Sequence, residues 1–402
     1  LHSFPTRRSS DLEMFGMTLM GQALERRAGN RLKALLGRMT TNRFVGLLTG
    51  LGVTAIIQSS SATTVMVVGF VNSGLMTLKQ AINVIMGANI GTTVTAWILS
   101  LAGIESSNFF IRLLKPSSFT PVLALAGIIF YMASKNSKRK DTGLILLGFA
   151  TLMYGMETMS DAVSVLRSVP SFQQMFLAFT NPVLGVIAGA VLTAIIQSSS
   201  ASVGILQALA STGAVSYGAA IPIIMGQNIG TCITAMLSSI GTTRNAKRAA
   251  LVHFSFNLIG AAVWLTVFCL VKAILAPIFL TQAADMMGIA VFHSMFNILC
   301  TLLMLPFSQV LEQMVCRILP DAKVPEKEKE LDERLLGSPA LALNQCRQVL
   351  SNMAELSIRA FRDSAACVLN YDKVIADRIR EAENNTDHLE DLISTYLLKL
   401  TS

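Results

Sequence analysis

The chain has 402 residues, of which 52% are hydrophobic and only 14% are charged, whereas soluble globular proteins carry roughly 25% charged residues. Residues 1–319 carry 21 Lys and Arg against 9 Asp and Glu, but residues 320–402 carry 11 against 15. A basic, apolar body with an acidic tail is typical of a membrane domain with a soluble appendage. The basic residues fall in short loops between apolar runs, so they indicate membrane topology and exclude nucleic acid as the expected partner.

The chain is expected to have five parts. Residues 1–12 are polar and basic and give way abruptly to an apolar run, so we interpret them as a non-native segment and not as a signal peptide. Two membrane repeats follow, repeat 1 over 13–141 and repeat 2 with a final helix pair over 142–319. A charged linker over 320–337 then leads to a helical domain over 338–402.

An internal repeat with a constant offset of 139 residues defines the two halves. TAIIQSSSA recurs without change at 54–62 and 193–201, and GANIGT at 87–92 returns as GQNIGT at 226–231. FGM at 15–17 also matches YGM at 154–156. Chance similarity between apolar stretches would not keep one register over so many residues, so we infer a duplication.

Loop charge predicts that the two copies are inverted. Residues 25–43 carry six basic residues, whereas their counterpart, 164–182, carries only Arg167. Because positive loops stay inside, equivalent loops should lie on opposite sides of the membrane. The expected fold is therefore an all-α polytopic membrane protein with two inverted-topology repeats. Re-entrant hairpins are predicted over 44–77 and 183–217, and crossing spans over 80–103, 119–134, 142–163, 219–241, 249–275 and 287–311.

The tail is predicted to be cytoplasmic and helical. Apolar residues fall on a stripe from about Ala340 to Phe361, and a second stripe follows Tyr371 to the end of the chain. Two amphipathic helices bury little apolar surface between them. The tail is therefore expected to contact further helices, a second copy of the chain or a cytoplasmic regulator.

The repeated QSSS sequence predicts an ion site. Each motif follows a short, glycine-rich apolar run that cannot span a bilayer of about 30 Å, so the helix should break near the midplane. Serine hydroxyls and the N–H groups of the next helix suit an oxyanion. Backbone carbonyl and amide oxygens suit a hard cation such as sodium. The GxNIGT motif adds polar groups, although close helix packing by small residues is the alternative interpretation. The predicted substrate and ion site comprises Gln58, Ser59, Ser60, Ser61, Thr63, Asn89, Thr92, Gln197, Ser198, Ser199, Ser200, Asn228 and Thr231.

Other polar pairs favour simpler interpretations. His253 with Asn257 and His293 with Asn297 could bind a metal, but interhelical hydrogen bonding is favoured because no carboxylate or cysteine joins them. Glu157 and Asp161 are interpreted as an interfacial pair. The motif serines have no base at a recognisable spacing, which argues against a hydrolase or any other enzyme. No cofactor is expected beyond a sodium ion at the motif residues.

With these motifs, residues from about 14 to 310 resemble the sodium/phosphate cotransporter family, and the tail resembles the start of a PhoU-like domain, here incomplete. The resemblance implies sodium-coupled transport of inorganic phosphate across the bacterial cytoplasmic membrane, by alternating access around the paired QSSS motifs. The alternatives are transport of another oxyanion or an organic phosphate, or phosphate sensing through the tail. Copy two departs from copy one at Ser202-Val203 and Thr231-Cys232, which predicts cation sites in one half only.

Overall fold

The computed structural model describes residues 11–12, 14–24, 26, 42–103, 116–164, 181–320, 331, 336, 339–369 and 371–401. These residues form helices and no strand. The chain divides into two compact units, residues 1–68 with 78–320 and residues 69–77 with 321–402. The loops whose charges were compared, 25–43 and 164–182, lie mostly outside the described residues, as do residues 1–10 and most of the linker.

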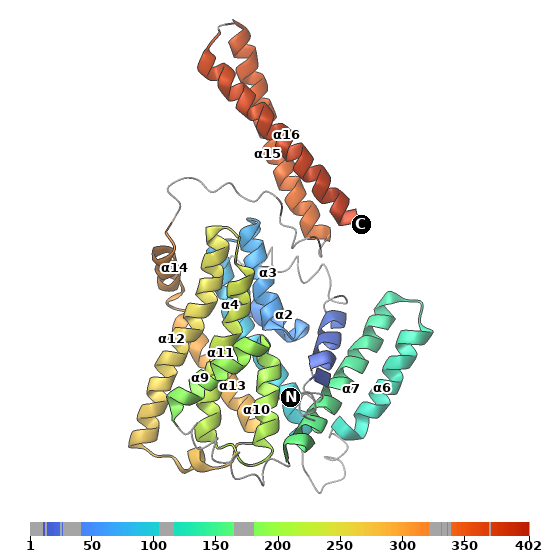
Figure 1. Cartoon of the computed structure of the whole chain (residues 1–402), viewed down its shortest axis with the longest axis vertical. Helices are drawn as coiled ribbons and strands as arrows, with labels where there is room; N and C mark the ends of the chain where they lie inside the picture. The colour runs from blue at the N-terminus through green and yellow to red at the C-terminus, as the bar shows by residue number, and fades with distance from the viewer. Residues whose placement is uncertain are drawn as a thin grey trace. The chain divides into compact units, whose positions relative to one another are not determined.

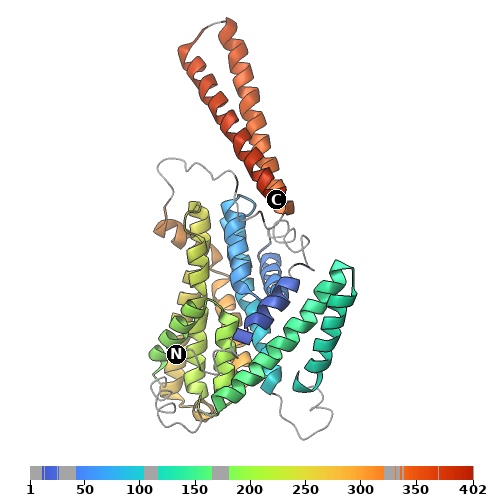
Figure 2. The ribbon, with the colours of Figure 1, turned by 45° about the vertical axis from the view of Figure 1, so that its right-hand side comes forward.

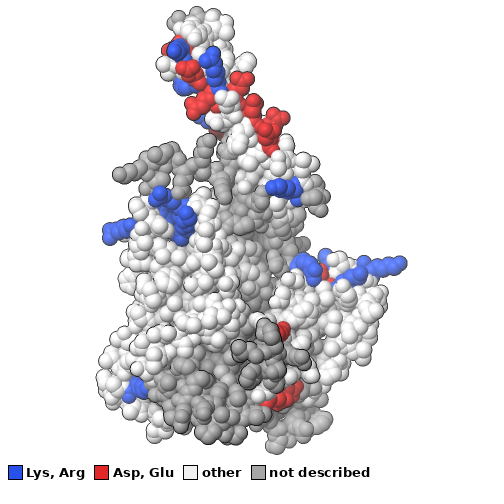
Figure 3. All heavy atoms as spheres, in the orientation of Figure 1, with Lys and Arg blue, Asp and Glu red and all other residues white. Residues whose placement is uncertain are grey.

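The first unit is a bundle of apolar helices (Figures 1 and 2). Five of its helices are long and apolar enough to cross a membrane, and most of its described surface in Figure 3 is uncharged. The unit is therefore a multi-pass membrane domain. Its helices are α2 (Arg43–Ile57), α3 (Ser60–Asn72, of which residues 69–72 belong to the second unit), α4 (Leu78–Ser100), α6 (Pro116–Ala133), α7 (Ser137–Ser164), α9 (Pro182–Ile196), α10 (Ser199–Ala210), α11 (Tyr217–Ser238), α12 (Arg244–Ile274), α13 (Met286–Met304) and α14 (Ser308–Ile318), with short 3-10 turns η1 (Leu101–Gly103) and η3 (Ile278–Thr281).

The two predicted hairpin segments are helices broken at the QSSS motif. Asn42 accepts a hydrogen bond from the N–H of Phe44 at 2.9 Å and begins α2, and Asn181 accepts one from Val183 at 3.0 Å and begins α9. Gln58 and Gln197 end these helices in the left-handed conformation, with φ of 61° and 58°. An αL residue at this position stops a helix. The predicted break is therefore present in both copies.

Glycines of the GxNIGT motif allow α4 and α11 to pack closely on the broken helices. A Cβ atom on Gly87 would overlap the carbonyl oxygen of Leu47 in α2, and one on Gly226 would overlap that of Val186 in α9. The motif lies within unbroken helices, so its glycines act here in helix packing. The same backbone contacts recur at the offset of 139 residues, which gives α2 with α4 and α9 with α11 the same register.

The core of the unit contains equivalent residues from both copies. Met17 and Met20 share one buried cluster with their counterparts Met156 and Met159. The helix pair α6 and α7 lies beside the other helices and packs through Gly127 and Gly143 (Figures 1 and 2). The methionine cluster thus brings the beginnings of the two sequence copies together.

The last predicted span differs in the structure. A single helix was expected over 287–311, but α13 ends at Met304 and α14 begins at Ser308. Pro306 lies between them and cannot continue the hydrogen-bonding pattern of α13. Arg248 on α12 donates to the carbonyl oxygen of Leu319 through Nε at 2.9 Å and Nη2 at 2.6 Å, so it caps the end of α14.

The second unit contains the helical tail. Its helices α15 (Pro339–Leu369) and α16 (Lys373–Thr401) form a long hairpin. Cys346, Val349, Leu389 and Tyr396 are buried. The two predicted amphipathic helices are therefore present, and part of their apolar stripe, including Phe361 at 76% exposure, is not covered within this unit.

Candidate functional site

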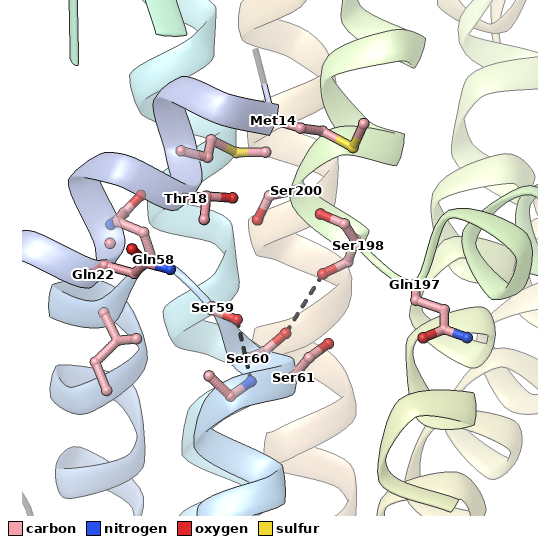
Figure 4. A pocket seen from close by; sticks show the side chains of 15 residues that line it. Met14, Thr18, Gln22, Gln58, Ser59, Ser60, Ser61, Gln197, Ser198 and Ser200 are labelled. Atoms are coloured by element: carbon pink, nitrogen blue, oxygen red, sulfur yellow. Dashed lines mark hydrogen bonds between the residues drawn. The ribbon is translucent and has the colours of Figure 1, made fainter. Parts of the chain in front are cut away.

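A cavity of about 300 Å³ lies between the two QSSS breaks (Figure 4). We call it the motif cavity. A water molecule occupies about 30 Å³ of liquid, so the cavity has room for a tetrahedral oxyanion with some hydration. Its lining comprises Met14, Met17, Thr18, Gly21, Gln22, Ile57, Gln58, Ser59, Ser60, Ser61, Ala62, Gln197, Ser198, Ser199 and Ser200.

The first serine of each motif caps the helix that follows it. Ser59 Oγ accepts a hydrogen bond from the N–H of Ala62 at 3.1 Å, and Ser198 Oγ accepts one from Ala201 at 3.2 Å. These caps begin α3 and α10 at the cavity wall. The first N–H groups of a helix have no partner within it, so the N–H groups of Ser60 and Ser199 remain available for an anion.

The second serines of the two motifs meet. Ser60 Oγ lies 3.5 Å from Ser199 Oγ, and these residues are 139 positions apart, which is the repeat offset. A residue can contact its own counterpart only close to the axis that relates two copies. The two helix N-termini therefore converge on one place, and their hydroxyls face the same cavity.

Threonines behind the breaks hold the hairpins together. Thr54 Oγ1 donates to Thr63 Oγ1 at 3.1 Å in copy one, and Thr193 Oγ1 donates to Ser202 Oγ at 2.7 Å in copy two. In copy two, Gln227 Nε2 also donates to Ser202 Oγ at 3.0 Å. The position of Gln227 is Ala88 in copy one, so the two halves differ here through sequence.

Five predicted site residues lie away from the cavity wall. Thr63 donates to the carbonyl oxygen of Ser59 at 3.0 Å, inside its own helix. The four GxNIGT residues, Asn89, Thr92, Asn228 and Thr231, are buried between helices. Three of these four donate to the carbonyl oxygen four residues earlier on their own helix. The remaining eight predicted residues, the two QSSS motifs, all line the cavity.

The sequence interpretation omitted the wall contributed by residues 14–24. Thr18 and Gln22 are exposed and line the cavity, together with Met14 and Met17. The sequence did place these positions within the repeat, since Thr18 and Gln22 are the counterparts of Glu157 and Asp161 at the offset of 139 residues. Glu157 and Asp161 themselves do not line the cavity.

The motif cavity contains no fixed charge among its described lining residues. The N-termini of α3 and α10 supply partial positive charge, and the C-terminal ends of α2 and α9 supply carbonyl oxygens. Half-helix ends of this kind bind anions and sodium ions in transporters. The described residues form no cluster of three His, Cys, Asp or Glu side chains that could hold a metal ion.

The buried histidine of α12 makes an interhelical contact. His253 Nε2 lies 3.3 Å from Asn89 Oδ1 on α4, and Asn257 Nδ2 donates to Cys232 Sγ on α11 at 3.3 Å. His293 on α13 is also buried, but neither of its ring nitrogens has a hydrogen-bonding partner among the described residues. Interhelical hydrogen bonding, which the sequence favoured for both histidines, is therefore present at His253.

The sequence that carries the two QSSS motifs matches a known protein family. The Na+/Pi-cotransporter family model matches the chain twice, over residues 12–161 and 152–294. The chain belongs to the Na+/Pi-cotransporter family. A PhoU domain model also matches residues 350–402, within the tail. No solved structure matches the chain.

Curated relatives include bacterial and human members. The putative inorganic phosphate export protein YjbB of Salmonella typhimurium is 29% identical over 84% of this chain and 60% of its own length. YqeW of Bacillus subtilis, an uncharacterized protein, is 27% identical over 76% of this chain and 94% of its own length. The human sodium-dependent phosphate transport protein 2B is 23% identical over 56% of this chain and 52% of its own length. The chain thus spans about 60% of the length of the exporters it matches.

Proposed function

We propose that the chain carries inorganic phosphate across the bacterial cytoplasmic membrane together with sodium, at the motif cavity. The observation that supports this most is the contact between Ser60 and Ser199. It joins two helix N-termini at a cavity lined by hydroxyl and amide groups and wide enough for an oxyanion. The names of the relatives, a phosphate exporter and a sodium-dependent phosphate transporter, agree with this substrate.

The proposed coupling to sodium rests on the lack of a fixed positive charge in the lining of the motif cavity. A divalent anion is costly to move into a medium of low dielectric unless its charge is compensated. No Lys or Arg lines the described cavity wall, and helix ends supply only about half a charge each. Sodium ions bound at carbonyl, hydroxyl and amide oxygens of the breaks would supply the remainder. We therefore propose that sodium binds before phosphate.

Alternating access is proposed to arise from two inverted halves. The Ser60–Ser199 contact and the repeated packing of α2 on α4 and α9 on α11 support a twofold relation. The difference in basic charge between residues 25–43 and 164–182 supports the inversion. Rocking of one half against the other around a fixed midplane site would then expose the cavity to each side in turn.

The test is phosphate flux in proteoliposomes containing the purified full chain. Labelled phosphate should cross the membrane when a sodium gradient is imposed in either direction, and the flux should vanish when potassium replaces sodium. Flux that persists unchanged in potassium would refute the coupling.

Competition identifies the anion. Sulfate, arsenate and phosphonates should be compared as inhibitors of labelled-phosphate flux. Strong inhibition by arsenate alone supports inorganic phosphate, because arsenate shares its charge and tetrahedral shape. Flux of a phosphonate or organic phosphate that exceeds that of phosphate would favour the alternative substrate. No flux of any anion, with phosphate still bound, would favour a sensor.

A further inference from the structure

The two motif glutamines occupy different environments although their backbones are the same. Gln58 has φ 61° and ψ 24°, and Gln197 has φ 58° and ψ 21°. The side chain of Gln58 is buried, whereas that of Gln197 is exposed. Because the backbone agrees within a few degrees, the difference lies in where each side chain goes.

Gln58 is docked on α4. Thr95 Oγ1 donates to Gln58 Oε1 at 3.0 Å, and Gln58 Nε2 donates to the carbonyl oxygen of Ala55. Both ends of the amide are therefore paired within copy one. Gln58 thereby closes the end of α2 against α4.

The same docking point exists in copy two and is not used. The counterpart of Thr95 is Thr234 on α11, 139 positions later. Thr234 Oγ1 is buried and has no hydrogen-bonding partner among the described residues. A buried hydroxyl without a partner is costly. Gln197 makes no side-chain hydrogen bond to a described residue, and its exposed side chain points away from the motif serines (Figure 4).

The two halves share the register that would let Gln197 reach Thr234. Gly87 packs on Leu47 in copy one as Gly226 packs on Val186 in copy two. Thr234 is therefore placed relative to the backbone of Gln197 as Thr95 is placed relative to Gln58. Docking Gln197 needs side-chain rotation and no new helix register.

We propose that Thr95 and Thr234 are alternate positioning residues for the two motif glutamines. In the state described here Gln58 is docked on Thr95 and Gln197 is not docked on Thr234. In the opposite state Gln197 is docked on Thr234 and Gln58 is released. The position of the cavity agrees, because Thr18 of copy one lines it and its counterpart Glu157 does not. This inference rests on the proposed alternation of the two halves.

Valine substitutions should shift the balance between the two states in opposite directions. Thr95→Val removes a hydrogen bond from the state described here and an unpaired hydroxyl from the opposite state. Thr234→Val does the reverse. A shift of about fivefold corresponds to one net hydrogen bond. A purely structural role for either threonine would not give opposite signs.

The reporter is a cysteine at position 18, which is exposed to the cavity in this state. Each variant is made in the full chain carrying Thr18→Cys, purified in detergent, and treated with a charged thiosulfonate reagent. Mass spectrometry of the peptide gives the modification rate at position 18 alone. The rate should fall with Thr95→Val and rise with Thr234→Val, and serine at either position should restore the original rate.

Thr54→Val and Thr193→Val are the matched controls, because both halves already make this contact. They should leave the rate within twofold of the unsubstituted reporter protein. Shifts of the same sign for Thr95→Val and Thr234→Val, or no shift for Thr234→Val, would overturn the inference. The assay contains no phosphate, so a protein that transports phosphate but fails here keeps the proposed function and loses only the exchange.

Discussion

Among single residues, the hydroxyl groups of the motif cavity matter most for the proposed phosphate site. Ser60 and Ser199 lie at the two helix N-termini and contact each other across the repeat axis. Ser59 and Ser198 have a different role, since they cap their own helices. The middle serines are therefore the better candidates for direct contact with phosphate.

Ser60→Ala and Ser199→Ala should each lower phosphate transport at least tenfold. A hydrogen bond to a charged group contributes about 1.5–3 kcal/mol, and 1.4 kcal/mol is a factor of ten. The measurement is the initial rate of labelled-phosphate flux at low phosphate, normalised to inserted protein. Ser211→Ala, at the end of α10 and outside the cavity, is the control and should keep the rate. Normal flux in both variants would remove these hydroxyls from the site.

The sequence predicted that the two QSSS motifs break their helices and meet, because a polar run inside an apolar helix has few stable places in a membrane. It did not separate Ser59 from Ser60, because capping depends on where the helix begins. It also assigned Asn89 to the site, whereas Asn89 contacts His253 on another helix. That contact joins positions 164 residues apart, and no local pattern predicts it.

At the scale of elements, the packing of α2 on α4 and α9 on α11 sets the position of the breaks. Sequence reasoning left two interpretations of the GxNIGT motif, polar groups for the ion site or close helix packing by its small residues. The structure has close packing, since α4 and α11 run unbroken through the motif. Helix ends were less predictable: one span was expected over residues 287–311, but α13 ends at Met304 and the more polar α14 begins at Ser308, beyond Pro306.

Gly87→Ala should destabilise the membrane unit, because its Cβ would overlap the backbone oxygen of Leu47. Overpacking of this kind costs about 1–3 kcal/mol. Gly52→Ala on α2 is the matched control, since a Cβ there meets no atom within 4 Å, and alanine favours the helix by about 1 kcal/mol. The fraction of monodisperse protein after heating in detergent should drop for the first and hold or rise for the second. Equal stability would contradict the packing described.

At the scale of the whole molecule, the charge pattern predicts the topology. The inverted arrangement places the basic loop near Asn136 and the start of α12 near Lys247 on the cytoplasmic side. It places the turn near Gln282 on the opposite side. The basic loop of residues 25–43 would supply the strongest evidence, but most of it lies outside the described residues.

Cysteines introduced singly at these three positions, of which Asn136 and Gln282 are exposed and Lys247 is half-buried, test that topology. In inside-out vesicles a membrane-impermeant maleimide should label Asn136→Cys and Lys247→Cys and leave Gln282→Cys unlabelled. Right-side-out vesicles should give the reverse pattern. Labelling of all three positions from one side would rule out the predicted topology.

The most direct test of the central claim is equilibrium binding of labelled phosphate to the purified full chain, titrated with sodium. Sodium should raise the affinity for phosphate and potassium should not, and the double variant Ser60→Ala/Ser199→Ala should lose the sodium-dependent binding. Binding by the double variant that matches the unsubstituted protein in sodium would contradict a phosphate site at the meeting point of the two breaks.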